Sequence, residues 1–196
     1  MRLLLATTNR DKLREIRSLL ADVPVELIAL SDVAPVVEPE ETGETFRENA
    51  RLKARYYAAH SGMLTVAEDS GLVIDALDGE PGVRSARFLR PDASYSERFV
   101  EIFERLARHP ERPRTARFVC ALSMVDGDRI AFETMGTVEG IIATAAVGGR
   151  GFGYDPIFYY PPYKATLAEV DEDQKLAIAH RGQAFRALAS WIRGNQ

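Results

Sequence analysis

The stretch "LLLATTNRDKLREIRSLLADVPVELIAL", residues 3–30, decides the fold class of this chain. It begins with an apolar run at 3–6, continues with a helical spacing that includes Leu13 and Ile16, and closes with a second apolar run at 25–30. A strand, an amphipathic helix and a second strand in this order are typical of a βαβ unit, whose two strands are parallel. The stretch therefore predicts an α/β protein.

Later helices are predicted by their ends as well as by their apolar spacing. A capping box opens one helix at Thr45, and Gly62 ends it. A second capping box opens another helix at Ser94, and that helix ends by Pro110. Apolar residues at helical spacing within 185–192 predict a last helix.

The second half of the chain contains a hairpin signal. The strand-like runs "RFVCALSMV" (117–125) and "RIAFETMGTV" (129–138) are joined by "DGD" at 126–128, which predicts an antiparallel pair. The sheet is therefore expected to be mixed. Because the chain shows no internal repeat, low-complexity tract or Gly/Ser linker, we expect a single domain over 1–196, pinched into two lobes around a cleft.

Composition narrows the class of protein. The 196 residues carry a formal net charge of -4, which argues against a surface that grips a nucleic-acid polymer. No stretch approaches the roughly 20 apolar residues of a membrane span, and "MRLLLA" is too short for a signal peptide. Cys120 lies in an apolar run and is expected to be a small buried hydrophobe in a protein of the reducing cytoplasm.

Polar side chains gather where the first strand gives way to the first helix. Thr7, Thr8, Asn9 and Lys12 stand at the helix N-terminus, where free N–H groups and the positive end of the dipole attract anions such as phosphate. The alternative is that Asn9 only caps the helix and Lys12 is solvated.

Two acidic clusters follow. Glu40 and Glu41 precede a helix on which Asn49 and Lys53 are i, i+4 neighbours, although acids near a helix start also simply complement its dipole. In the second cluster, Glu68, Asp69 and Ser70 directly follow the apolar run "LTVA" at 64–67. We expect that strand to end there, where adjacent carboxylates would suit Mg²⁺; an acidic turn is the alternative.

Two later clusters suggest recognition of a base. "GGRGFGYDPIFYYPP" (148–162) combines glycines with Phe152, a ring that could stack on a base, although the aromatic residues could instead belong to the core. Lys175, His180 and Arg181 are donors that could read keto oxygens or neutralise phosphates, or decorate a helix start. All five clusters together describe a nucleoside triphosphate site.

The same five stretches resemble, in order and spacing, the non-standard purine NTP pyrophosphatases, known as the Ham1 or inosine triphosphate pyrophosphatase family. The resemblance spans nearly the whole chain and rests on "ATTNRDKLREI" (6–16), "EETGETFRENARLKA" (40–54), "EDSGLVIDALDGEPGVRSAR" (68–87), "GFGYDPIF" (151–158) and "AHRGQAFRAL" (179–188).

This resemblance implies hydrolysis of ITP, dITP and XTP to the monophosphate and pyrophosphate with Mg²⁺, which keeps these nucleotides out of DNA and RNA. It also implies a homodimer whose long twisted mixed sheet is flanked by helices, with two lobes around a central cleft. The substrate is a purine nucleoside triphosphate, and neither a nucleic-acid polymer nor a membrane is an expected partner.

The resemblance further implies the site residues. Asp69 would be the general base and a metal ligand, and Glu40 or Glu41 would complete the metal site. Residues 7–12 would hold the phosphates, 152–155 would form the base platform, and the three later donors would read the 6-oxo edge. The residues expected to bind substrate are Thr7, Thr8, Asn9, Arg10, Asp11, Lys12, Lys53, Ser70, Phe152, Gly153, Tyr154, Asp155, Lys175, His180 and Arg181.

Three positions depart from the family pattern. Glu68 stands where aspartate is more usual, Arg150 where a small residue is common, and Arg84 where an aromatic residue is common. Two rival interpretations are a house-cleaning pyrophosphatase with another base preference, as in the Maf-like proteins, and a catalytically silent nucleotide-binding protein.

Overall fold

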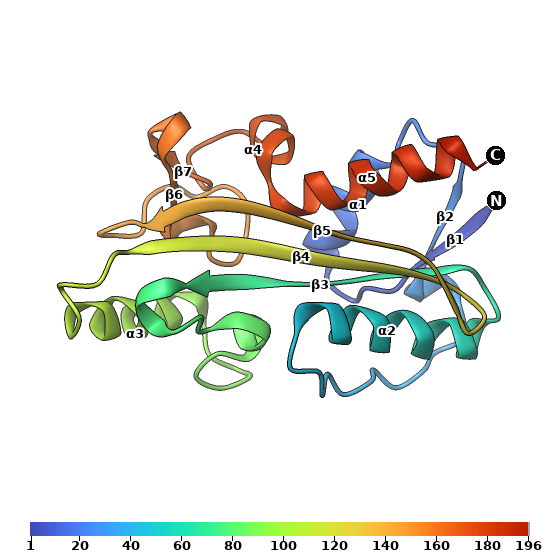
Figure 1. Ribbon diagram of the computed structural model, residues 1–196, viewed down its shortest axis with the longest axis horizontal. Coiled ribbons are helices and arrows are strands. Elements are labelled where there is room, and N and C mark those ends of the chain that lie inside the picture. The colour runs from blue at the N-terminus through green and yellow to red at the C-terminus, as the bar shows by residue number, and fades with distance from the viewer. Residues whose placement is uncertain (196) are drawn as a thin grey trace. The chain divides into compact units, whose positions relative to one another are not determined.

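The computed structural model describes residues 1–195, and its strands form one seven-stranded sheet in the order β2-β1-β3-β4-β5-β6-β7 (Figure 1). The strands are β1 (Arg2–Leu5), β2 (Glu26–Ala29), β3 (Thr65–Ile74), β4 (Thr115–Asp126), β5 (Arg129–Ile142), β6 (Phe158–Tyr160) and β7 (Ala165–Thr166). The helices are α1 (Arg10–Leu19), α2 (Phe46–Ser61), α3 (Tyr95–Ala107), α4 (Glu172–Ile178) and α5 (His180–Gly194).

The sheet is mixed, as predicted. β1 pairs in parallel with β2 and β3, whereas β6 pairs antiparallel with β5 and β7. β4 and β5 are joined by a tight turn at Gly127, whose φ of 58° lies in the left-handed region that favours glycine. The predicted βαβ unit and the predicted hairpin are both confirmed.

Contacts divide the chain into two compact units, each built from several segments. Unit 1 comprises Met1–Asp69, Cys120–Gly136 and His180–Gln196; unit 2 comprises Ser70–Val119 and Thr137–Ala179. Each unit has its own hydrophobic core. The single domain with a central cleft stays a prediction.

In unit 1, α1 and α5 cover one face of the strands and α2 covers the other (Figure 1). Successive strand residues point to opposite faces, so Leu3 and Leu5 pack toward α1 and α5 while Leu4 packs toward α2. β3 repeats this alternation, with Val66 on the α1–α5 face and Ala67 on the α2 face. This alternation determines where the polar residues further along β3 point.

The predicted helix ends are confirmed. Thr45 and Glu48 form a capping box at the start of α2, and Gly62 ends that helix with a φ of 67°. Ser94 and Glu97 form the same box at the start of α3. A capping side chain of this kind is worth about 1 kcal/mol, so these short signals help to set where each helix begins.

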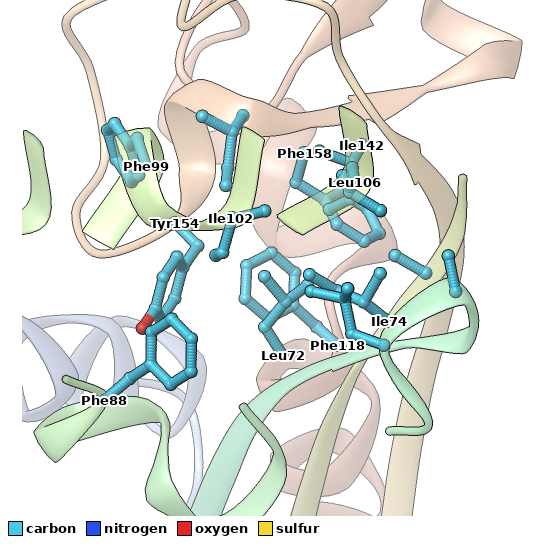
Figure 2. Close-up of a cluster of buried hydrophobic side chains, with 14 of the residues drawn as sticks. Leu72, Ile74, Phe88, Phe99, Ile102, Leu106, Phe118, Ile142, Tyr154 and Phe158 are labelled. Carbon is cyan, nitrogen blue, oxygen red and sulfur yellow. The ribbon is translucent and has the colours of Figure 1, made fainter. Parts of the chain in front are cut away.

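The core of unit 2 is rich in aromatic residues, and Figure 2 shows Phe118 and Phe158 among aliphatic side chains from β3 and α3. Their ring centroids lie 4.6 Å apart. Tyr154 belongs to the same buried cluster. Full burial of each large side chain contributes roughly 1.5–3 kcal/mol, so this packing can hold the surrounding loops in place.

Two features differ from the sequence-based expectation. β3 does not end at Ala67 but continues to Ile74, because Glu68 and Asp69 are paired with Lys12 and Lys53 and the apolar residues 71–74 extend the strand. The short helix α4, capped by Asp171, was not predicted. Among the described residues, no helix is long and apolar enough to cross a membrane.

Candidate active site

The first polar cluster lies at the N-terminus of α1. The Asn9 side chain accepts hydrogen bonds from the backbone N–H groups of Asp11, at 2.9 Å, and Lys12, at 3.1 Å. Thr7 Oγ1 accepts from the Asn9 N–H, and Thr8 Oγ1 donates to Glu38 at 3.4 Å. Asn9 therefore caps the helix, as the alternative interpretation held, but Lys12 is paired with Glu68 and not simply solvated. The exposed neighbours of Asn9 lie where an anion could approach.

A buried lysine joins two carboxylates on the α2 face of unit 1. Lys53 Nζ lies 2.7 Å from Glu41 Oε1 and 2.9 Å from Asp69 Oδ1. Burial disfavours the charged ammonium, but the two carboxylates raise the pKa of Lys53 overall. Burial also raises the pKa of Asp69, an effect that Lys53 opposes and Glu41 reinforces. Lys53 is therefore a permanent cation beside a carboxylate whose affinity for a proton is increased.

Asn49 holds this group together from the same helix. Its side-chain amide donates to Asp69 Oδ2 at 3.3 Å and accepts from the Gly43 N–H at 2.8 Å. A Cβ atom on Gly43 would lie 2.7 Å from the Asn49 oxygen, so the close approach of the loop favours glycine there. Asn49 thereby orients Asp69 and anchors the loop that carries Glu41.

The neighbouring carboxylates of β3 point in opposite directions. Asp69 faces α2 and Lys53, whereas Glu68 faces α1 and α5 with Lys12, Arg181 and the Cys120 thiol as partners. The two adjacent carboxylates therefore do not face a common site, and the expectation that the strand ends before them is wrong. The strand continues through both residues, and its alternation separates their side chains.

Glu68 is the centre of a buried ion cluster on the α1–α5 face. Lys12 Nζ lies 2.7 Å from Glu68 Oε1, and Arg181, 2% exposed, pairs with Glu15 at 2.6 Å and with Glu68 at 3.5 Å. Burial alone would raise the pKa of Glu68, but Lys12 and Arg181 hold it well below its ordinary value. Lys12 is thus fixed beside the helix N-terminus by a carboxylate that stays charged.

Glu15 was missed by the sequence analysis. It lies three residues after Lys12 on the same helix and is buried, whereas an acid within a helix is usually solvated. Its i, i+3 spacing from Lys12 places both side chains on the same face of α1, and this spacing was the available signal. Cys120 is fully buried, as predicted, and burial raises the pKa of its thiol well above the ordinary value.

Unit 2 contains the second group of predicted site residues. Lys175 Nζ lies 2.6 Å from Asp155 Oδ2 and 4.6 Å from the centroid of the Phe152 ring. Asp155 Oδ2 also accepts from the Phe152 N–H at 2.8 Å. Gly151 and Gly153 have φ values of 68° and 66°, which allow the tight turn around this carboxylate. Lys175, Asp155 and the half-buried Phe152 therefore form one compact group.

The remaining predicted residues are placed differently. Tyr154 is part of the core of unit 2, which matches the core alternative for its ring. Glu40 and Arg10 are exposed, Asp11 pairs with Arg14 at 2.9 Å, and Ser70 is partly buried in β3. His180 is buried as the first residue of α5, and a Cβ on Gly136 would lie only 2.1 Å from its carbonyl oxygen.

Glu41 and Asp69 are the carboxylates whose placement suits a divalent cation. Within residues 1–195, no group of three His, Cys, Asp or Glu side chains could hold a metal ion. Two carboxylates still fit a hard cation of the Mg²⁺ type, which commonly binds one or two carboxylates and completes its shell with water and substrate phosphates. The donor set therefore fits a cation that arrives with a phosphate substrate.

Lysines and carboxylates gathered around one strand, next to a helix N-terminus that attracts anions, are typical of the active site of an enzyme with a phosphate-containing substrate. The chain belongs to the Ham1 family, whose model matches residues 3–191. The family resemblance seen in the sequence is thereby confirmed.

Individual relatives match nearly end to end. The chain is 44% identical over 192 residues to the dITP/XTP pyrophosphatase of Exiguobacterium sp. (strain ATCC BAA-1283 / AT1b), covering 98% of this chain and 97% of that protein. It is 42% identical over 196 residues to the dITP/XTP pyrophosphatase of Yersinia pseudotuberculosis, covering 98% of each.

Solved structures agree with the fold. A HAM1 protein from Coxiella burnetii has a TM-score of 0.93 at 38% identity, covering 99% of each chain. The Staphylococcus aureus Ham1 protein has a TM-score of 0.89 at 36% identity, covering 100% of each chain. The predicted mixed α/β sheet flanked by helices is the fold that these structures share with the chain.

Proposed function

We propose that the protein hydrolyses non-standard purine nucleoside triphosphates, namely ITP, dITP and XTP, to the monophosphate and pyrophosphate. The observation that carries the proposal is that the buried Lys53 joins the buried Asp69 to the partly buried Glu41, in a chain similar to proteins named dITP/XTP pyrophosphatase. Removal of these nucleotides from the pool would keep them out of DNA and RNA.

Asp69 is the proposed general base. It would take a proton from the water that attacks the α-phosphorus, and the bond between the α-phosphorus and the bridging oxygen would break to release pyrophosphate. Because burial raises its pKa, Asp69 accepts a proton more readily than a solvated aspartate does. Asn49 and Lys53 hold the carboxylate in one orientation and so keep the accepting oxygen in place.

The phosphates are proposed to bind at the start of α1. Thr7, Thr8 and the N-terminal end of the helix supply hydroxyl groups and the positive end of the dipole, and Lys12 supplies a charge fixed by Glu68. Lys53 would neutralise further charge from the α2 face. These donors would stabilise the leaving pyrophosphate.

Glu41 and Asp69 are the proposed ligands of Mg²⁺. When bound, the ion would polarise the phosphoryl oxygens and neutralise charge on the triphosphate. We choose Glu41 over Glu40 because Glu41 already shares Lys53 with Asp69, whereas Glu40 is exposed.

Base recognition is assigned to unit 2, with Phe152 as the stacking ring and Lys175 as the donor to the 6-oxo group. Lys175 lies against that ring while paired with Asp155. A donor that only a keto oxygen satisfies disfavours adenine, because an amino group would leave the donor unpaired. Arg181 would have to donate to the 6-oxo group while its guanidinium also pairs with Glu15 and Glu68.

Pyrophosphate release with Mg²⁺ from ITP, dITP, XTP, dATP, dGTP, dCTP and dTTP tests the proposal. We expect the first three substrates to be hydrolysed at least ~10²-fold faster than the others, since unpaired buried donors can reject an analogue by this much or more. Equal rates, or a preference for a pyrimidine, would refute the assignment of the base.

Two accompanying proposals concern assembly and location. We propose a homodimer, which light scattering behind a sizing column would detect as twice the chain mass of 21.8 kDa. We also propose the cytoplasm as the place of action, since the only cysteine is a buried thiol and no disulfide is needed. Fractionation of the producing cell would test the location.

A further inference from the structure

Ser85 is the centre of a buried polar group in unit 2. It lies in a short 3₁₀ helix, Gly82–Arg87, and is 5% exposed. Its hydroxyl donates to the Gly82 carbonyl at 2.6 Å and accepts from the Leu72 N–H at 2.9 Å. The hydroxyl therefore ties this 3₁₀ helix to β3.

The backbone carbonyl of Ser85 accepts two further side chains. The Tyr154 hydroxyl donates to it at 2.8 Å, and Arg98 Nη1 from α3 donates at 3.5 Å. A carbonyl oxygen has two lone pairs, so these two donors use its capacity in full. Ser85, Tyr154 and Arg98, called the Ser85 hub below, join β3, the 3₁₀ helix, α3 and the loop that contains Tyr154.

Arg98 is an unusual member of the hub. It is 3% exposed, yet it forms no ion pair with a carboxylate among residues 1–195. Its guanidinium donates to two backbone carbonyls, the second being that of Pro91 at 3.4 Å, lies 4.8 Å from the centroid of the Tyr95 ring, and interacts electrostatically with the Tyr154 hydroxyl. Burying a charge without a charged partner costs stability, so Arg98 is not explained by stability alone.

Tyr154 links the hub to the loop assigned to the base. It lies between Gly153 and Asp155, and Asp155 in turn holds the Phe152 backbone and Lys175. Figure 2 shows the Tyr154 ring packed in the core with its hydroxyl at the end nearer Phe88, which belongs to the segment that follows Ser85. Burial raises the pKa of Tyr154, so its hydroxyl remains a donor at neutral pH.

We propose that the Ser85 hub positions the segment 152–155 for the base of the substrate, and that Tyr154 and Arg98 are positioning residues that act through Phe152 and Asp155. This inference rests on the proposed function, because that function assigns the segment to base recognition. Ser85 is thereby a support for the segment 152–155.

Tyr154→Phe tests the proposal, because it removes the hydroxyl and keeps the ring. Tyr56→Phe is the matched control: the Tyr56 hydroxyl also donates to a backbone carbonyl, that of Val37, at 2.7 Å, but in unit 1. Loss of one neutral hydrogen bond predicts a rise in KM for ITP of about fivefold, with kcat within about twofold of the unchanged protein. Hydrogen exchange at the amides of 151–155 should be faster in Tyr154→Phe only.

Arg98→Met gives a second test that does not depend on the tyrosine. We expect KM for ITP to rise with little change in kcat while Tm does not fall, because the variant removes a buried charge that lacks a carboxylate partner. A residue with a purely structural role would lower Tm and leave KM unchanged.

The outcomes separate the hub from the proposed function. The proposal is overturned if Tyr154→Phe matches Tyr56→Phe in both KM and exchange, or if exchange becomes faster while KM is unchanged. If the unchanged protein releases no pyrophosphate from any purine triphosphate, the proposed function fails and exchange alone decides. In that case, faster hydrogen exchange at 151–155 in Tyr154→Phe supports the role of the Ser85 hub in holding this segment. Unchanged exchange overturns it.

Discussion

Replacing Lys53 with methionine would remove the ammonium group from between two carboxylates while keeping most of the side-chain volume. Nζ lies 2.7 Å from Glu41 and 2.9 Å from Asp69, and the side chains of Lys53 and Asp69 are only 9% and 7% exposed. The variant therefore leaves two carboxylates close together in a largely dry environment, with Asn49 as the remaining donor to Asp69.

The expected loss of stability follows from this geometry. Removing one partner of a buried ion pair costs about 3–5 kcal/mol, because the other charge stays buried and uncompensated. For a protein of this size such a loss lowers Tm by roughly 10 °C. It is also a large share of the roughly 5–15 kcal/mol that stabilises a typical folded protein.

The pH dependence of this loss has a definite sign. Burial raises the pKa of Asp69, Lys53 opposes the rise and Glu41 adds to it, so without Lys53 the folded-state pKa moves further above its unfolded value. A carboxyl group of this kind binds its proton more readily in the folded state, and its contribution to stability falls as pH rises through the folded-state pKa. The deficit of Lys53→Met should therefore be largest near pH 7 and shrink toward about pH 5.

Urea unfolding at several pH values in metal-free buffer measures this deficit. Arg55→Met is the matched control, because Arg55 is exposed on the same helix and makes no ion pair within the described chain. We expect Arg55→Met to change stability by less than ~0.5 kcal/mol. If Lys53→Met is as stable as the control at pH 7, or if its deficit grows as pH falls, the reasoning is refuted.

Three further substitutions give separate predictions. Asp69→Asn should lower kcat for ITP by about 10²–10⁴-fold with its fold intact by circular dichroism, as expected for loss of a general base, and near-normal turnover would contradict that role. Gly136→Ala places a Cβ 2.1 Å from the His180 carbonyl oxygen, so the backbone must shift and urea unfolding should show a loss of about 1–3 kcal/mol. Lys175→Met leaves the Asp155 carboxylate buried without its ammonium partner, so thermal melts should show a lower Tm and kinetics a higher KM for ITP. An unchanged Tm would mean that Asp155 does not need Lys175.

The parts of the fold that were predictable are those set by neighbouring residues. The capping box of Thr45 and Glu48 sets the start of α2, and Gly62 sets its end. The turn at Gly127 joins the two strands of the hairpin. Caps and turns satisfy backbone groups within a few positions, so they can be recognised locally. The length of β3 was not predictable in this way. Two adjacent acidic residues, Glu68 and Asp69, indicate the end of a buried strand in the sequence. The strand continues because Lys12 and Lys53 pair with them, and these pairings are tertiary contacts.

The candidate site shows the same difference between local signals and distant contacts. The sequence motifs contain Lys12, Lys53 and Asp69, whose residue types and spacing indicate phosphate binding and proton transfer. Glu15 and Ser85 were not predicted to support the site because their partners lie far away in sequence: Arg181 is 166 residues from Glu15, and Tyr154 is 69 residues from Ser85. Sequence motifs identify groups that carry chemistry more readily than the residues that hold those groups in place.

The alternation of β3 also separates two groups of charged side chains. On the α1–α5 face, Glu68 contacts Lys12 and Arg181, and Arg181 also pairs with Glu15. On the α2 face, Glu41 and Asp69 both contact Lys53. A triphosphate at the proposed site would add negative charge beside these two carboxylates. A divalent cation held by them, as proposed above, would offset that charge in addition to Lys53.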